Sequence, residues 1–214
     1  MKKIILSLSC ILLLLRSSAQ LTWNPPVRAD QSLNHGDVGY NTSSAIVNGN
    51  PAMVYYDQGE FRIMFVRALD ATGTTWGPAV IIDSVDVFNE KLSLQVVNGN
   101  PAVAYYGGTN GNLCYKRASD MNGSTWGTKV TVDASGMTGF YASMKIVNGN
   151  PAIAYYDWLN TTLKYVRASD ASGTTWNTPL TLDGATVAVG SHCSLSIIAG
   201  NPAISYSDDD NFNL

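Results

Sequence analysis

Aromatic and acidic side chains recur along the chain in a pattern that suits a sugar ligand. Three evenly spaced segments contain a Tyr-Tyr pair, and an aspartate follows the pair in two of them. A tyrosine ring offers an apolar face and a hydroxyl, and a carboxylate accepts hydrogen bonds from sugar hydroxyls. Packing between structural units is the alternative role for these tyrosines. The candidate ligand-binding residues are Tyr56, Asp57, Tyr106, Tyr141, Tyr156, Asp157, Trp158 and His192, with Phe140 beside them and Tyr206 expected in register with the second tyrosine of each pair.

Other kinds of chemistry find little support in the sequence. No nucleophile with its base, metal-ligand cluster or phosphate-binding loop is recognisable. His192 occupies a position that differs in every repeat, which indicates exposure rather than metal binding. The run Asp208-Asp209-Asp210 could bind calcium, but we interpret it as a solvated loop. We therefore predict no catalytic residue, no metal and no cofactor in this chain.

The elements that position these side chains come from a stretch that the chain contains four times. The first copy, VNGNPAMVYYD, begins at Val47, and later copies begin at Val97 and Val147, with a looser one at Ile198. A period of about 50 residues indicates a solenoid, a propeller or an array. The contents of one period decide between these architectures.

Each period predicts four short antiparallel strands. In the third copy the strand-like runs are 143–147, 152–156, 163–167 and 176–182, and they alternate with turn residues such as Asn148-Gly149. No run has the 3.6-residue periodicity of a helix. Four such strands describe one blade, so the sequence predicts an all-β, β-propeller-like fold of four-stranded antiparallel blades.

The units give about three full blades plus partial blades. We expect an open arc or a fragment of a larger propeller, with an incomplete last blade whose open edge favours self-association. The predicted units are about 41–83, 91–133 and 141–183, a partial unit at 192–214, and a last strand of a preceding blade at 21–27 within a repeat domain of 21–214.

The N-terminus and the charge restrict location and partners. Residues 1–20 have the basic start, apolar run and small-residue end of a secretory signal peptide, so we expect a secreted, periplasmic or surface protein with no membrane insertion after cleavage. Without that segment, 10 basic residues face 16 acidic ones, a net charge of about −6 that argues against nucleic acid. Cys114 and Cys193 lie in different units and predict two buried thiols rather than a disulfide.

The turn before the fourth strand carries the motif of a known repeat. It reads LDATGTTW at 69–76, SDMNGSTW at 119–126 and SDASGTTW at 169–176. This resembles the Asp-box, the bacterial neuraminidase repeat, with the aspartate one place earlier than in the usual Ser-x-Asp-x-Gly-x-Thr-Trp. The longer core resembles repeats of secreted bacterial proteins of unassigned function. The resemblance implies a structural role, away from the ligand face, for Asp70, Gly73, Trp76, Asp120, Gly123, Trp126, Asp170, Gly173 and Trp176.

The resemblance does not extend to the sialidase active site. Such a site needs three arginines, a tyrosine nucleophile and a glutamate partner, whereas Arg67, Arg117 and Arg167 recur in step and are better explained as bracing a turn. A kelch-type propeller is the alternative subtype. The leading hypothesis is a secreted or cell-surface, non-catalytic module that binds a glycan or a surface protein. The alternatives are a fragment of a sialidase-like glycoside hydrolase with catalytic residues outside this chain, and a structural spacer.

Overall fold

All regular structure in the described part of the chain is β-strand. The computed structural model describes residues 25–30, 38–85, 91–107, 110–184 and 187–211. The predicted signal peptide, the first four residues of the predicted strand at 21–27 and the last three residues of the predicted partial unit at 192–214 lie outside these ranges. Nothing in them forms a helix long and apolar enough to cross a membrane.

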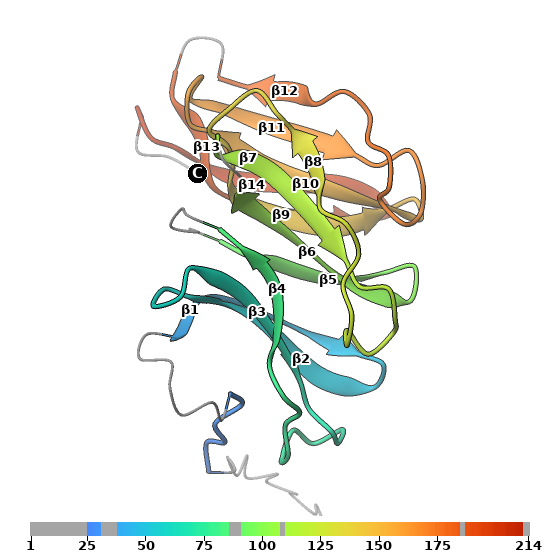
Figure 1. The fold of residues 1–214 in the computed structure, drawn as a ribbon. Coiled ribbons are helices and arrows are strands. Elements are labelled where there is room, and N and C mark those ends of the chain that lie inside the picture. The colour runs from blue at the N-terminus through green and yellow to red at the C-terminus, as the bar shows by residue number, and fades with distance from the viewer. Residues whose placement is uncertain (1–24, 31–37, 86–90, 108–109, 185–186, 212–214) are drawn as a thin grey trace, which may run out of the picture.

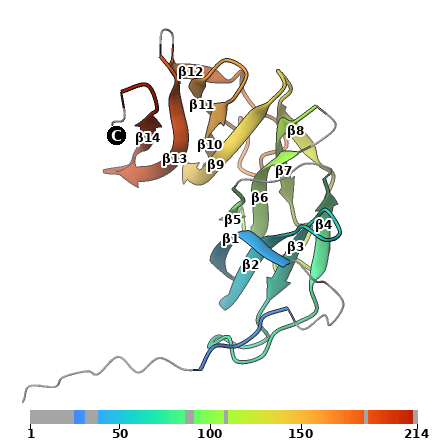
Figure 2. The same ribbon diagram turned by 90° about the vertical axis from the view of Figure 1, so that its left-hand side faces the viewer.

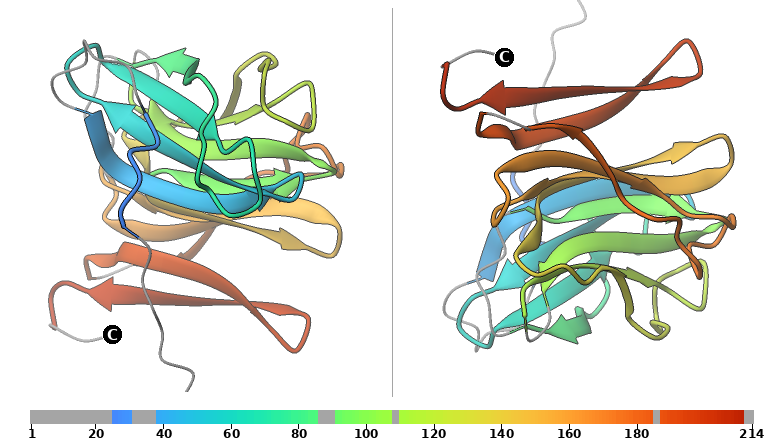
Figure 3. Two further views of the ribbon diagram at one scale, coloured as in Figure 1. Left: turned by 90° about the horizontal axis from the view of Figure 1, so that it is seen from below. Right: turned by 90° about the horizontal axis from the view of Figure 1, so that it is seen from above.

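Three four-stranded antiparallel sheets and one two-stranded sheet follow one another in an arc that is not closed (Figures 1 and 2). The views along the vertical axis show the sheets stacked face to face in chain order (Figure 3). This is the predicted all-β, β-propeller-like architecture.

Blade one is β1 (Val38–Val47), β2 (Asn50–Asp57), β3 (Arg62–Arg67) and β4 (Val80–Ser84). Blade two is β5 (Ser93–Val97), β6 (Asn100–Gly107), β7 (Asn112–Arg117) and β8 (Val130–Asp133). Blade three is β9 (Thr138–Val147), β10 (Asn150–Asp157), β11 (Thr162–Arg167) and β12 (Leu180–Asp183), and the half-blade is β13 (Val189–Ile198) and β14 (Asn201–Asp208).

A tight turn joins the first two strands of every sheet. In blade three, Asn148 and Gly149 both have positive φ, at 46° and 81°. A two-residue turn of this kind matches the twist of the strands and favours Asn-Gly. The turn fixes the register, with Val147 opposite Asn150 and Ala154 opposite Ser143. The repeated Asn-Gly therefore sets which strand faces are buried.

The core lies between consecutive sheets rather than inside any one of them. Phe65 of blade one packs with Leu94 and Tyr105 of blade two in one apolar cluster. Tyr115 of blade two packs with Met144 of blade three in the next. Each sheet thus needs its neighbour to bury its apolar face, as stacked repeats do.

The repeat predicted the strand order well but missed two strand boundaries. The first strand of blade three begins at Thr138, well before the expected residue 143, because irregular pairing opposite Ala154 to Asp157 carries the strand further. The fourth strand begins at Leu180 rather than at Trp176, which makes only an isolated bridge to Ala168. Cys114 and Cys193 are free and buried, as predicted, and burial raises the pKa of their thiols to about 11 and about 12.

Candidate ligand-binding surface

In three of the four sheets of the described chain, a bulged first strand presents one variable residue at the same position: Asn41, Tyr141 and His192. Tyr141 and His192 both have a left-handed backbone, with φ of 54° and 52°, where the strand pairing shifts. A glycine precedes each by two residues, and Cβ atoms added at Gly139 and Gly190 would lie within 2.8 Å of the preceding blade's backbone. The glycines let the sheets approach closely, and the bulges direct the next side chains outward.

Six aromatic side chains meet around this position, and we call them the aromatic surface. Tyr141 stacks on His192, with ring centroids 4.3 Å apart and an interplanar angle of 28°. Phe140 lies 5.5 Å from Trp158, which is 51% exposed. Beneath them are two largely buried tyrosines from the second strands of blades two and three. The aromatic surface consists of Phe140, Tyr141, Trp158 and His192, supported by Tyr106 and Tyr156.

Polar groups border the stacked pair. The Ser191 hydroxyl lies 3.1 Å from His192 Nδ1 and donates to Asp209 Oδ1 at 2.8 Å. Because its one hydrogen is used in the bond to Asp209, the Ser191 hydroxyl can only accept a hydrogen bond from His192. In a neutral imidazole, Nδ1 therefore carries the hydrogen and Nε2 is left as an acceptor. Burial, followed by the charge of Asp209, raises the pKa of Tyr156, so its phenol stays protonated. The border therefore combines hydrogen-bond donors with acceptors.

Three of the predicted ligand residues occupy structural positions instead. Tyr56 is fully buried in the core between blades one and two. Asp57 and Asp157 are also buried, at the turns between second and third strands. Asp157 accepts from the Asn160 backbone N–H at 3.0 Å and lies 3.3 Å from Lys164 Nζ. An aspartate holding its own turn in this way is a local structural device.

The register assigned to Tyr206 also needs correction. The hydroxyls of Tyr105, Tyr155 and Tyr206 each donate at 2.6 Å to an aspartate at or next to the end of the last strand of the preceding blade. Tyr206 thus belongs with the first tyrosine of each pair, not the second. The aspartates are Asp83, Asp133 and Asp183, and Tyr55 makes the same bond to Asp30. A similar spacing of aspartate and tyrosine in successive units, with separations of 22, 22 and 23 residues for the last three pairs, was the sequence signal for these inter-blade links.

The turns that resemble the Asp-box lie at the other end of the strands. Asp120 accepts backbone N–H groups of Asn122, Ser124 and Thr125, and these bonds lower its pKa to about 2 although burial opposes the shift. Trp126 Nε1 donates to the Gly123 carbonyl at 3.0 Å, and Gly123 has φ of 75°. The equivalent bonds recur around Asp70 and Asp170. Each of the three Trp side chains is half-buried.

The three recurring arginines brace the Asn-Gly turns. Arg117 Nε donates to the Val97 carbonyl at 2.8 Å, and Nη2 donates to the Asn98 carbonyl at 2.7 Å. Arg67 and Arg167 make the same pair of bonds. Their guanidinium groups are thus bound to backbone oxygen at the end of the molecule opposite the aromatic surface. No group of three metal-ligating side chains occurs within the described ranges.

Lys91 makes a contact between blades that the sequence did not predict. Its ammonium donates to the Cys193 carbonyl at 2.8 Å and so joins blade two directly to the half-blade. Burial lowers the pKa of Lys91, an effect that the nearby charge of Lys145 reinforces. Lys91 comes at the position equivalent to Tyr141 and His192, and nothing local in the sequence distinguishes a residue that crosses between sheets from an exposed one.

Comparisons with known proteins identify the fold and no closer relationship. No protein-family model matches the chain, and no curated protein sequence matches it. Among solved structures, an exo-beta-1,3-galactanase from Phanerochaete chrysosporium with galactose is similar at a TM-score of 0.55 and 15% identity, over 78% of this chain and 42% of that one. A "Bifunctional GH43-CE" protein from Bacteroides eggerthii matches at 0.53 and 11% identity, over 80% of this chain and 24% of that one. The chain thus spans less than half the length of these proteins, and at such identities the likeness is one of fold.

Proposed function

We propose that the aromatic surface binds a carbohydrate and that the chain acts as a non-catalytic, secreted or cell-surface glycan-binding module of the Asp-box type. The observation that carries this proposal is the assembly of Trp158 and the Tyr141–His192 stack beside Asp209. A sugar ring can stack its apolar face on the exposed indole, while its hydroxyls reach the polar border. The similarity in fold to a galactanase supports this ligand class.

The proposal is tested by titrating the chain with galactose and β-1,3-galactan oligosaccharides in a calorimeter, after a wider glycan array. We expect Trp158→Ala to weaken binding roughly five- to thirtyfold, which corresponds to the loss of one stacking contact of about 1–2 kcal/mol. Phe61→Ala is the matched control, because Phe61 also precedes a third strand and is also 51% exposed, but belongs to blade one. Its affinity should be unchanged.

A reducing-sugar assay on the same samples, together with the titrations, separates the alternatives. Release of reducing sugar from galactan by the chain would favour the glycoside hydrolase over a non-catalytic module. Absence of binding to every glycan on the array, or equal affinity of Trp158→Ala and the parent chain, would contradict the proposal.

A further inference from the structure

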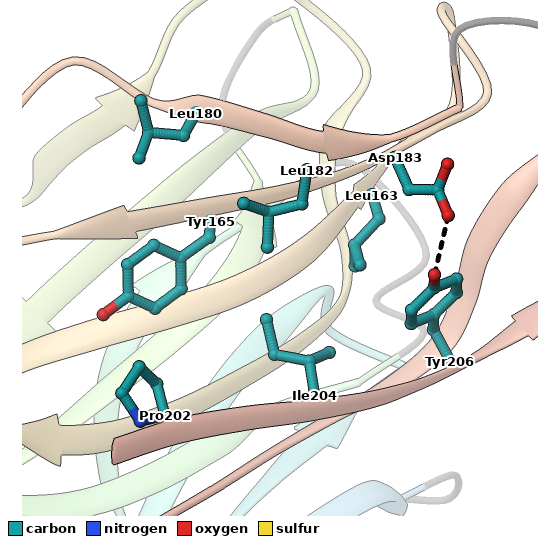
Figure 4. A pocket seen from close by; sticks show the side chains of 8 residues that line it. All are labelled: Leu163, Tyr165, Leu180, Leu182, Asp183, Pro202, Ile204 and Tyr206. Atoms are coloured by element: carbon teal, nitrogen blue, oxygen red, sulfur yellow. Dashed lines mark hydrogen bonds between the residues drawn. The ribbon is translucent and has the colours of Figure 1, made fainter.

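An apolar groove lies between blade three and the half-blade. Its volume is about 460 Å³. Tyr165, Leu180 and Leu182 of blade three form one wall, and Pro202 and Ile204 of β14 form the other (Figure 4). The Tyr206–Asp183 hydrogen bond crosses one end of the groove (Figure 4). The groove is therefore built by the same elements that form the core at the other blade junctions.

Equivalent positions in the other blades are covered. Ile82 on β4 and Val132 on β8 are 2% and 8% exposed, whereas Leu182 on β12 is 49% exposed. The half-blade packs on β9, β10 and part of β11, and in the described residues β14 pairs with β13 alone. In blade three, β10 pairs on both sides, with β9 and β11. In the described residues the half-blade has no third and fourth strand, and the groove lies on the part of blade three that these strands would face.

The two complete junctions show what fills this place. The Trp126 ring meets the Phe65 ring edge-on at 5.4 Å, and the Trp176 ring meets Tyr115 at 5.3 Å in the same geometry. A Cβ added to Gly173 would lie 2.8 Å from the Tyr115 ring. A turn with glycine and tryptophan three residues apart therefore covers the aromatic ring of the preceding blade. Tyr165 is the corresponding ring of blade three.

We propose that the groove is a docking site for a β-hairpin of the repeat's own type, consisting of a third strand, a Gly-x-x-Trp turn and a fourth strand. The third strand pairs with the open edge of β14, and the tryptophan packs edge-on against Tyr165. This occupant covers Leu180 and Leu182 and completes a four-stranded sheet on β13 and β14. The hairpin binds in two ways at once. Main-chain hydrogen bonds to the edge of β14 supply affinity, and the site for the tryptophan ring supplies specificity.

A second folded copy of the chain is a poorer occupant. In each complete blade the third and fourth strands are already joined to two more strands. Those two strands would overlap the half-blade, which already covers β9 and β10. A free hairpin has no such conflict, so the proposal commits to it.

The test uses a synthetic peptide of residues 161–183, which contains the third strand, turn and fourth strand of blade three. Titrated into the purified full chain, it should bind with 1:1 stoichiometry and raise the melting temperature. Two control peptides carry Trp176→Ala and Gly173→Ala, and each should bind at least about tenfold more weakly. In the protein, Leu182→Asp should abolish binding, whereas Ile46→Asp, at an exposed site on β1, should not.

Each remaining outcome contradicts the proposal. Equal binding of all three peptides would make the groove a non-specific apolar surface. A dimer in sedimentation that Leu182→Asp dissociates and the peptide does not compete with would assign the groove to a second copy. A monomer that binds none of the peptides would leave the groove as ordinary exposed surface. Because the control peptides act independently of the variant protein, the conclusion stands even where Leu182→Asp fails to fold.

Discussion

At the scale of single residues, the turn between β13 and β14 has an alanine where the other three turns have asparagine. Ala199 has φ of 49°, close to the 46° of Asn148. A left-handed backbone costs about 1–2 kcal/mol for most L-residues and less for asparagine. Ala199→Asn should therefore stabilise the chain by roughly 0.5–1 kcal/mol. Urea unfolding measures this, and Asn148→Ala should show the reverse change. A destabilised Ala199→Asn would contradict the backbone-strain argument.

A second residue-scale feature is the ion cluster that joins blade two to blade three. Lys164 Nζ lies 2.8 Å from Asp133 Oδ2 and 3.3 Å from Asp157 Oδ2, and all three side chains are largely buried. Burial alone would raise the pKa of Asp133, but hydrogen bonds from Lys164 and other donors outweigh it and the pKa is lowered. Burial likewise opposes the charge on Lys164, yet the two carboxylates raise its pKa.

This cluster makes a pH prediction. The contribution of Asp133 to stability is complete above its unfolded pKa, near 4, and is lost as pH falls through the lower folded pKa. The contribution of Lys164 is complete below about pH 10.5 and is lost at higher pH. Lys164→Met, which copies Met64 of blade one, should cost about 3 kcal/mol at pH 7 because it leaves buried carboxylates unpaired. Unfolding curves should show the cost shrinking below about pH 4, and a pH-independent cost would contradict the ion-pair interpretation.

At the scale of elements, the turn between third and fourth strands is also a contact between blades. Gly123 and Gly73 have nearly the same φ, 75° and 71°, so alanine strains both backbones equally. A Cβ at Gly123 would lie 2.4 Å from the Phe65 ring, whereas at Gly73 the nearest atom is Pro51 Cγ at 3.6 Å. Gly123→Ala should therefore lose about 1–3 kcal/mol more than Gly73→Ala in chemical denaturation. Equal losses would show that only the turn conformation matters.

The elements themselves were largely predictable from the sequence, because the repeat specifies its first two strands four times and its third and fourth strands three times. Alignment of the repeats placed every sheet in order, and the Asn-Gly turns fixed the second strand of the three complete blades. The bulge before Tyr141 could not be predicted, since it depends on Gly139 packing on Leu113 of the preceding blade. Period and turn chemistry are local, whereas this contact joins residues of different blades.

The candidate site was predictable only in part, for the same reason. Sequence reasoning placed Tyr141, Trp158 and His192 in a common group, and the structure brings them together. It could not separate Tyr56, which is core, from Tyr156, which lies under the aromatic surface, because both occupy the same repeat position. Burial at such a position depends on the neighbouring sheet and not on the residue.

At the scale of the whole molecule, stability depends on junctions between neighbouring sheets, and these junctions are unequal. The half-blade joins blade three through a smaller cluster around Cys193 and Leu195, and its outer side borders the open groove. In stacked repeats each unit is held by its nearest neighbours, so a unit with one incomplete junction opens more easily than one between two complete junctions.

The final prediction is therefore that the half-blade opens before the rest of the molecule. The β9–β10 hairpin is the internal control, because its tight turn and strand register match those of β13–β14. In hydrogen exchange followed by mass spectrometry, amides of β13 and β14 should exchange faster than those of β9 and β10. Leu195→Ala removes a buried side chain from the half-blade junction and should accelerate exchange in β13–β14 more than in blades one and two. Uniform exchange across all the sheets would mean that the arc unfolds as a single cooperative unit despite its unequal junctions.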